Sequence, residues 1–133
     1  MTAAENVMLP MIFAGLTHDE AIAKSTDLLT IVGLDGRMTH KPSELSGGQQ
    51  QRVAIARALA NDPAIILADE PTGNLDPINA HEIIQIFKKI NDIGTTIILT
   101  THNKGVIDNL GKRVITMENG RIARDDKKGR YVL

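Results

Sequence analysis

Two carboxylates stand side by side in this sequence, directly after a run of apolar residues. Asp69 and Glu70 follow Ala64 to Ala68. If that run is a strand, alternate side chains point to opposite sides, so one carboxylate can face a metal ion while the other faces a reacting water. The alternative is an acidic pair that ends a strand and either caps a loop or pairs with a basic residue. The residue types alone leave both interpretations open.

A histidine follows a second apolar run in the same way. His102 comes after Thr95 to Thr101, a run that contains Ile97-Ile98-Leu99. A neutral imidazole at the end of a strand can donate a hydrogen bond to a phosphate oxygen. A hydrogen bond within the loop is the simpler interpretation of a single histidine, so this residue does not decide a function by itself.

A third candidate is the segment Ser46-Gly47-Gly48-Gln49. Ser and Gln three residues apart form the capping-box pattern of a helix N-terminus, and the two glycines leave backbone N–H groups there open to an anion. The alternative is a plain capping box preceded by a flexible loop. This segment alone is therefore a weak signal for an anion site.

The apolar pattern predicts the elements that must position these residues. Ala64 to Ala68 and Thr95 to Thr101 are short continuous apolar runs, typical of strands that are buried on both faces. Between them, Ile83, Phe87 and Ile90 share one face of an amphipathic helix. We therefore expect a right-handed β-α-β unit whose two strands are parallel.

The carboxyl ends of these two strands should gather the candidate residues. Ligands of parallel sheets bind beyond the carboxyl ends of the strands. Asp69 and Glu70 follow the first strand, and His102 follows the second. We predict that Glu70 and His102 lie at the same edge of the sheet.

Two further helices are expected before this unit. Asp19 to Val32 has apolar residues at helical spacing, with Thr17 as a possible N-cap and Gly33 as a stop. Gln50 to Ala60 contains good helix formers without Gly or Pro, and Asn61-Asp62-Pro63 ends it.

The last part of the sequence predicts a hairpin and a polar tail. Arg113 to Met117 and Arg121 to Arg124 flank an Asn-Gly turn at Glu118-Asn119-Gly120. The segment from Asp125 to Gly129 is expected at the surface. A basic cluster there is most simply a solvated tail rather than an anion site; its members are Lys127, Lys128 and Arg130.

Composition and charge exclude several classes of protein. The 133 residues carry 15 Lys and Arg against 16 Asp and Glu, and 42% are hydrophobic, which indicates one globular domain rather than a disordered chain. No cysteine is present, so disulfides, iron–sulfur clusters and thiolate zinc sites are excluded and a reducing compartment, the cytoplasm, is expected. Only 2% are aromatic, which leaves little for a base-stacking nucleic-acid surface. No apolar run approaches the roughly 20 residues that span a bilayer.

A metal site built from histidines is not expected. His81-Glu82 begins the helical H-E-x-x-H zinc motif, but Gln85 stands where the second histidine should be, so we interpret the segment as helix surface. The remaining candidates His18 and His40 are scattered along the chain.

Three segments, in this order, resemble the motifs of the ATP-binding-cassette ATPase family. They are Leu45 to Arg52 (LSGGQQQR), Ile65 to Asp76 (IILADEPTGNLD) and Thr101 to Asn103 (THN). They are similar to the family's signature motif, its Walker B strand with catalytic glutamate and D-loop, and its switch histidine. The resemblance covers nearly all of the chain.

Other features resemble one group within that family. The triple Gln after the signature and the run Pro71 to Asp76 are similar to the lipoprotein-release, macrolide-export and cell-division ATPases. The segments that are most similar to the cell-division ATPases are Thr101 to Lys104, Lys112 to Ile115, Gly120 to Ile122 and the short basic tail with Tyr131.

The resemblance implies an α/β fold, a partial P-loop NTPase fold. It has a parallel β-sheet core with flanking helices, part of a helical subdomain and a C-terminal β-hairpin. Residues 1–44 would belong to the helical subdomain, 45–60 to the signature loop and helix, and 61–133 to the C-terminal part of the nucleotide-binding core.

The family's phosphate-binding P-loop, G-x-x-x-x-G-K-[ST], and its Q-loop do not occur in the 133 residues. We therefore expect an incomplete domain, from a truncated gene or an internal start, that is inactive alone. Apolar surfaces that meet the absent strands in the family should then be exposed or repacked.

The resemblance also implies a role for each candidate residue. Glu70 would polarise the attacking water, His102 would contact the γ-phosphate of ATP, and Asp69 would help to hold Mg²⁺. Asp76 would couple the two halves of a dimer. The residues that would present N–H groups to a γ-phosphate held by a second chain are Ser46, Gly47, Gly48 and Gln49.

The partners implied by the resemblance are a second ATPase domain, forming a homodimer, and integral membrane subunits. The helical region near Met8 to Gly15 would contact those subunits, so that ATP hydrolysis drives their conformational change from the cytoplasmic face of the membrane. One alternative is a non-catalytic remnant that lends only its signature face. Another is a DNA-organising ATPase, which would need coiled-coil heptads or a basic face, and neither is in the sequence; no nucleic acid is expected.

Overall fold

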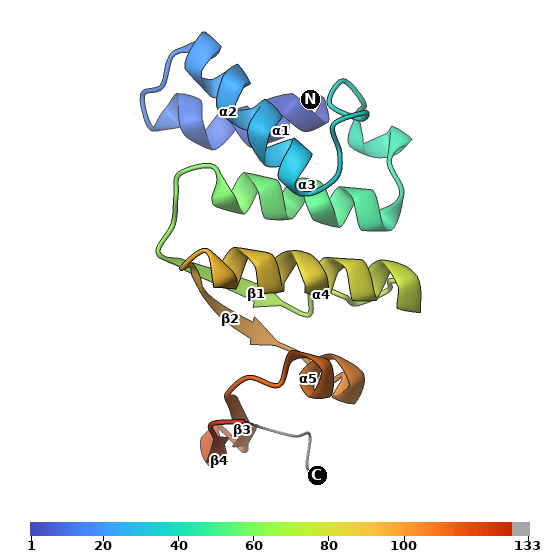
Figure 1. Cartoon of the computed structure of the whole chain (residues 1–133), viewed down its shortest axis with the longest axis vertical. Coiled ribbons are helices and arrows are strands. Elements are labelled where there is room, and N and C mark those ends of the chain that lie inside the picture. Colours follow the sequence, from blue (N-terminus) through green and yellow to red (C-terminus); the bar gives the residue numbers. More distant parts are fainter. Residues whose placement is uncertain (129–133) are drawn as a thin grey trace.

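The structure of the chain is a computed structural model, and it describes residues 1–128. Helices and strands follow one another along a long axis, with a helical layer at one end and a two-stranded hairpin at the other (Figure 1). Arg130 and Tyr131, which the tail prediction included, lie outside the described residues. Within residues 1–128, no helix combines the length and the apolar character needed to cross a bilayer.

The helical layer contains α1 (Ala3–Phe13), α2 (His18–Ile31) and α3 (Gly47–Leu59), with the short 3-10 helix η1 (Pro42–Glu44) before α3. The prediction for α2 is confirmed. Thr17 caps it by accepting a hydrogen bond from the Glu20 backbone N–H at 3.3 Å, and Gly33, with φ +78°, follows its end. The helix predicted over Gln50 to Ala60 is α3, which begins three residues earlier.

The predicted pair of parallel strands joined by a helix is confirmed. Strand β1 (Ile65–Asp69) pairs in parallel with β2 (Thr96–Thr100), from Ile65 opposite Thr96 to Asp69 opposite Thr100. The crossover is α4 (Pro77–Asp92). Its predicted apolar face is buried: Ile83, Phe87 and Ile90 are each at most 3% exposed. This crossover holds the two strand ends in register, which positions the candidate site.

One prediction about these strands is wrong. They are buried on one face only: Ile66 is in the core, whereas Leu67 is 76% exposed and Ile98, opposite it, is 54% exposed. The reason is that the core lies on one side of the sheet, and among residues 1–128 no element buries the other side. Ile65, Leu67 and Ile98 therefore form an exposed apolar face on this side of the sheet.

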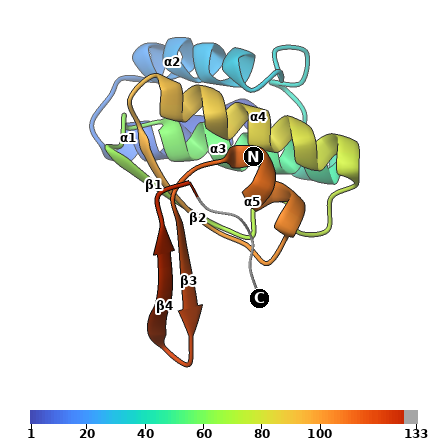
Figure 2. The ribbon, with the colours of Figure 1, turned by 60° about the horizontal axis from the view of Figure 1, so that its bottom comes forward.

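The C-terminal hairpin is confirmed. Strands β3 (Val114–Glu118) and β4 (Arg121–Asp126) are antiparallel and project from the body of the molecule (Figure 2). The turn residues Asn119 and Gly120 have φ +50° and +74°, the left-handed values that an Asn-Gly hairpin turn requires. Helix α5 (Lys104–Leu110), before the hairpin, was not expected.

The hydrophobic core joins the helical layer to α4 and one face of the sheet. Its most completely buried large side chains come from three helices and the loop after α2, and they include Met11, Leu29, Leu34, Ile83 and Ile90. Figure 1 shows α3 between the α1–α2 pair and α4. The signature segment at the start of α3 is therefore anchored by core packing along the rest of that helix.

Candidate functional site

The carboxyl ends of β1 and β2 bring Asp69, Glu70 and His102 to one edge of the sheet. The Glu70 backbone N–H donates to the Thr100 carbonyl at 2.9 Å, which continues the strand pairing by one residue. Beyond it, Glu70 Oε1 accepts a hydrogen bond from the His102 backbone N–H at 3.1 Å and lies 3.1 Å from His102 Nε2. The predicted proximity of Glu70 and His102 is confirmed.

The two adjacent carboxylates have different surroundings. Asp69 Oδ1 accepts a hydrogen bond from the Thr100 hydroxyl at 2.6 Å, whereas Glu70 faces His102. The alternation of side chains along the strand stops before Glu70, because the φ of +47° at this residue takes the chain out of the extended conformation. Such left-handed non-glycine residues are strained and concentrate at functional sites.

The imidazole of His102 is 95% exposed, while the Glu70 side chain is 36% exposed. An exposed imidazole that touches a less exposed carboxylate can reach a ligand beyond the sheet edge. The hydrogen bond within the loop, considered above as the simpler interpretation, is also present through the His102 backbone. The two interpretations are compatible, because they use different atoms of the residue.

The segment Ser46-Gly47-Gly48-Gln49 forms the N-terminus of α3 as predicted. The Ser46 hydroxyl accepts from the Gln49 backbone N–H at 3.2 Å, and Gln49 Oε1 accepts from the Ser46 backbone N–H at 3.0 Å. This reciprocal pair is a complete capping box. The loop before it is held by Gln50, whose side-chain amide donates to the carbonyls of Pro42 and Leu45 at 2.8 and 3.2 Å.

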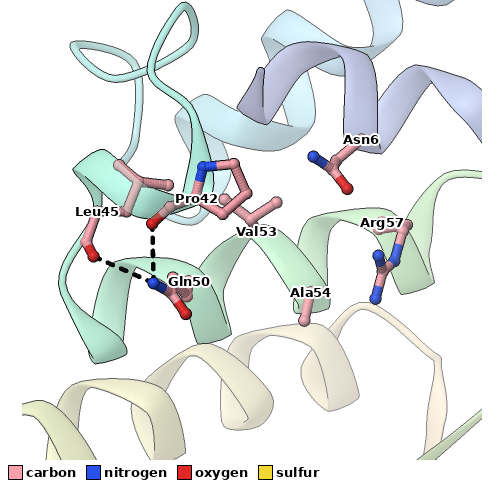
Figure 3. A pocket seen from close by; sticks show the side chains of 7 residues that line it. All are labelled: Asn6, Pro42, Leu45, Gln50, Val53, Ala54 and Arg57. Atoms are coloured by element: carbon pink, nitrogen blue, oxygen red, sulfur yellow. Dashed lines mark hydrogen bonds between the residues drawn. The ribbon is translucent and has the colours of Figure 1, made fainter. Parts of the chain in front are cut away.

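Figure 3 shows Gln50 in a hollow of about 110 Å³ between α1, η1 and α3. Asn6, Val53 and Arg57 also line it. A second hollow, of about 150 Å³, lies between α3 and β1 and includes Asp69. Of these two hollows, only the second borders a candidate residue, Asp69.

Asp76 caps the N-terminus of α4. Its carboxylate accepts hydrogen bonds from the Asn79 backbone N–H at 2.9 Å and from the Asn79 side-chain amide at 2.6 Å. These two bonds hold the pKa of Asp76 below its ordinary value, because they favour the charged form. The carboxylate is exposed and ionised, which suits a residue at an interface.

The structure arranges the eight predicted residues in two groups. Asp69, Glu70 and His102 form the sheet-edge group. The signature group contains Ser46 to Gln49 together with Asp76, whose capping partner Asn79 adjoins Gly48. The segment 70–76 links the groups through turns in which Gly73 N–H donates to Glu70 and Leu75 N–H to Thr72.

Three residues that hold parts of the candidate site in place were not predicted from the sequence. Thr100 and Asn79 each hydrogen-bond a candidate carboxylate, and Arg52 connects three helices. Asn79 stands three residues after Asp76, which is the spacing of an N-cap bond, so its role was visible in the sequence. Thr100 and Arg52 depend on which strand and which helix lie alongside, and a single sequence does not show that.

The residues at the sheet edge fit a magnesium ion that is shared with a substrate phosphate better than a metal ion that is held by protein ligands alone. Within residues 1–128, no cluster of three or more His, Asp and Glu side chains could hold a metal ion. Mg²⁺ is usually held by one or two carboxylates together with waters and substrate phosphates. Asp69, whose Oδ1 is held by Thr100, supplies a fixed carboxylate of that kind.

Comparisons with known proteins agree on one family. A family model described as "ABC transporter" matches residues 1–73. The cell division ATP-binding protein FtsE of Streptococcus pneumoniae is 46% identical over 130 residues, which are 98% of this chain and 56% of that protein. The macrolide export ATP-binding/permease protein MacB of Mannheimia succiniciproducens is 49% identical over 128 residues, 96% of this chain and 20% of that protein.

A solved structure gives the same result for the fold. It is the dimeric, post-hydrolysis state of the ATP-binding cassette MJ0796 bound to ADP and Pi, with a TM-score of 0.82 and 43% sequence identity. The match covers 98% of this chain and 58% of that one. The chain therefore spans little more than half the length of the FtsE and cassette relatives that it matches.

Proposed function

Because this chain belongs to the ABC transporter family, we propose that it is part of an ATP-hydrolysing subunit whose nucleotide is held between two domains. The observation that carries the proposal is the contact of Glu70 with His102 at the carboxyl ends of two parallel strands. It sets a carboxylate and an imidazole side by side at the edge where ligands of such sheets bind.

In this proposal Glu70 orients and polarises the water that attacks the γ-phosphate, and His102 donates a hydrogen bond to that phosphate. Phosphoryl transfer depends mainly on positioning and on charge stabilisation, so groups fixed on strand ends are suited to it. The His102 backbone N–H fixes one Glu70 oxygen, which limits the orientations of the carboxylate.

Asp69 is the residue that would hold Mg²⁺. The ion supplies charge neutralisation at the phosphate oxygens when it is bound. The Thr100 hydroxyl holds Asp69 Oδ1 at 2.6 Å, so the carboxylate has one preferred orientation before any ligand arrives.

The signature group is proposed to meet a nucleotide that is held by a second ATPase domain. The backbone N–H groups of Ser46 and Gln49 are already bonded within the capping box. The exposed Gly47, at the positive end of α3, is therefore the residue whose N–H is proposed to face the anion. Asp76, ionised and exposed, would contact the partner domain and couple the two halves. The dimeric MJ0796 cassette is the solved precedent for such an assembly.

In this proposal, ATP hydrolysis changes the conformation of integral membrane subunits. The ATPase subunit would be peripheral, on the cytoplasmic face of the membrane. The name of the MacB relative joins an ATP-binding and a permease function in one protein. We assign the contact with these membrane subunits to the region from Met8 to Gly15, where Phe13 at the end of α1 is 81% exposed.

The chain is proposed to consist of three parts of the ATPase domain. Residues 1–44 would belong to the helical subdomain, residues 45–60 would form the signature loop and helix, and residues 61–133 would belong to the nucleotide-binding core.

One further candidate is a non-catalytic partner that lends only its signature face. It is favoured by the sequence, since the P-loop pattern does not occur in the 133 residues. On either proposal the 133-residue chain by itself does not hydrolyse ATP. The two proposals make different predictions for a cassette in which a P-loop segment is added ahead of residue 1. The ATP-hydrolysing subunit predicts hydrolysis that depends on Glu70, and the non-catalytic partner predicts none.

The experiment is to measure ATP turnover and ATP affinity of that completed cassette with Glu70 and with Glu70→Gln. The substitution keeps the side-chain shape and removes the negative charge, so turnover should fall by about 10² to 10⁴-fold while affinity is kept. Glu118→Gln, at the exposed tip of the hairpin, is the matched control and should leave both unchanged. Turnover that survives Glu70→Gln would remove this residue from catalysis.

A further inference from the structure

The second glycine of the signature segment makes a close contact inside its own chain. Gly48 is buried, and a Cβ atom added to it would lie 2.7 Å from Asn79 Oδ1. The absent side chain thus leaves space for the Asn79 amide, which at the same time bonds Asp76 at the start of α4. Gly48 therefore has a role in packing, because the missing side chain leaves room for the Asn79 amide that bonds Asp76.

A second contact joins the same two helices one turn further along. Arg52 Nη2 pairs with Glu82 Oε2 on α4. The Arg52 side chain is 17% exposed, and its Nε is buried with no hydrogen-bond partner among the described residues. A cation in such a place is held by its charge partners, since an unpaired buried charge is costly.

Arg52 also reaches the end of α2. Its Nη1 lies 3.5 Å from the Val32 carbonyl, at the negative end of that helix, and a Cβ on Gly33 would come within 3.2 Å of Nη1. The guanidinium therefore sits where α2, α3 and α4 meet. The planar guanidinium of an arginine directs its donors toward acceptors in fixed directions, whereas the ammonium of a lysine is a single point charge on a flexible chain.

These contacts show the relative direction of α3 and α4. Gly48 meets Asn79 and Arg52 meets Glu82, so α3 and α4 are parallel and both begin at the same side of the molecule (Figure 1). Gly47 adds a third contact at that side, since a Cβ there would lie 3.6 Å from Leu75 Cδ2. The signature segment and the turn before α4 are consequently side by side.

We propose that Arg52 is a positioning residue which, together with the Gly48–Asn79 contact, locks the register of α3 on α4. The signature segment (46–49) then moves as one unit with residues 75–79, which end the turn and begin α4. The bond from Arg52 to the Val32 carbonyl joins that unit to the helical layer. Its importance for hydrolysis rests on the proposed function. The lock itself does not, because it is a property of the chain without nucleotide.

The test is a double-mutant cycle on the 133-residue chain, with denaturant unfolding followed for Arg52→Gln, Glu82→Gln and the pair. The lock predicts that the two substitutions are not additive, with a coupling of about threefold or more in the unfolding equilibrium constant. Arg57→Gln, on the exposed side of the same helix, is the control and should show no coupling to Glu82→Gln.

A second readout separates a lock from ordinary packing. In amide NMR spectra, Gly48→Ala and Arg52→Gln should each shift the resonances of Asp76 and Asn79, and Arg52→Lys should shift them less than Arg52→Gln. Asn79→Ala added to Gly48→Ala removes the clash with the amide group and leaves only the Asn79 Cβ at 3.3 Å, so it should recover part of the stability lost by Gly48→Ala alone. Additive unfolding effects, or Asp76 and Asn79 resonances that do not move, would each overturn the proposal. If Arg52→Gln does not fold, Glu82→Gln at its more exposed position gives the same NMR readout.

Discussion

At the scale of single residues, the candidate site depends on carboxylates whose orientation is fixed by hydrogen bonds of 2.6 to 3.1 Å. Asp69 is held by Thr100, Glu70 by the His102 backbone and Asp76 by Asn79. Each bond restricts an exposed side chain that would otherwise sample many rotamers. The residues with proposed roles are therefore oriented before any ligand is bound.

The Asp76 cap predicts a pH dependence of stability. Its pKa is lower in the folded chain than the ordinary value of 3.8, so the carboxylate stabilises the fold above that value and loses this effect as pH falls through the folded pKa. Between about pH 6 and about pH 3, Asp76→Asn should have a smaller decrease in melting temperature than the unsubstituted chain. Asp92→Asn, at the exposed other end of α4, is the control. Identical pH profiles for both variants and the unsubstituted chain would contradict the role of the cap.

At the scale of elements, α4 connects the sheet to the helical layer and supports both groups of site residues. Its first residue follows Asp76, and its buried face contacts the core through Ile83, Phe87 and Ile90. The two strand ends stay in register because this crossover packs on one face of the sheet. Loss of its packing should affect the whole molecule.

Ile83→Ala should lower the free energy of unfolding by about 2–5 kcal/mol, since the side chain is fully buried and truncation leaves a cavity. Ile78→Ala, on the same helix at a position 74% exposed, should change it by less than about 0.5 kcal/mol. Chemical denaturation of both variants measures the difference. Equal effects at the two positions would show that α4 does not pack as described.

Local signals explain which elements the sequence could predict. Thr17 and Ser46 form capping boxes, and Asn119-Gly120 forms a hairpin turn, so these element ends depend on residues close in sequence. Helix α5 was missed because its seven residues carry no clear apolar period. Asn103 at its N-cap and Gly111 after its end were the available signals.

Features that depend on packing partners were not predictable from one sequence. An apolar strand predicts burial, but whether both faces are buried depends on what lies against them, and Leu67 is exposed. The proximity of Glu70 and His102 followed from the parallel-strand rule. The Gly48–Asn79 and Arg52–Glu82 contacts did not, because they require the register between two helices.

At the scale of the whole molecule, the exposed face of the sheet differs from an ordinary globular surface. Ile65, Leu67 and Ile98 are each more than half exposed and share this face. Contiguous apolar surface of this kind favours association. The chain should therefore self-associate in solution at concentrations where most monomeric domains do not.

Sedimentation velocity tests this expectation. Leu67→Ser should shift the population toward monomer, because it removes the most exposed side chain of the face. Ile93→Ser is the matched control, since Ile93 is 78% exposed but lies at the end of α4, away from the sheet face. Association that is lost equally in both variants would argue against the sheet face.

We propose that these 133 residues carry the hydrolytic groups of an ABC ATPase and bind nucleotide only together with a P-loop that another segment or subunit supplies. P-loops bind phosphates through several backbone N–H groups and a lysine, and the signature segment alone offers too few contacts to replace them. Calorimetric titration of Mg-ATP into the purified 133-residue chain tests this claim most directly. We expect no saturable binding in the micromolar range and no turnover. Micromolar binding, or turnover that Glu70→Gln abolishes, would contradict it by showing that the chain is a complete enzyme.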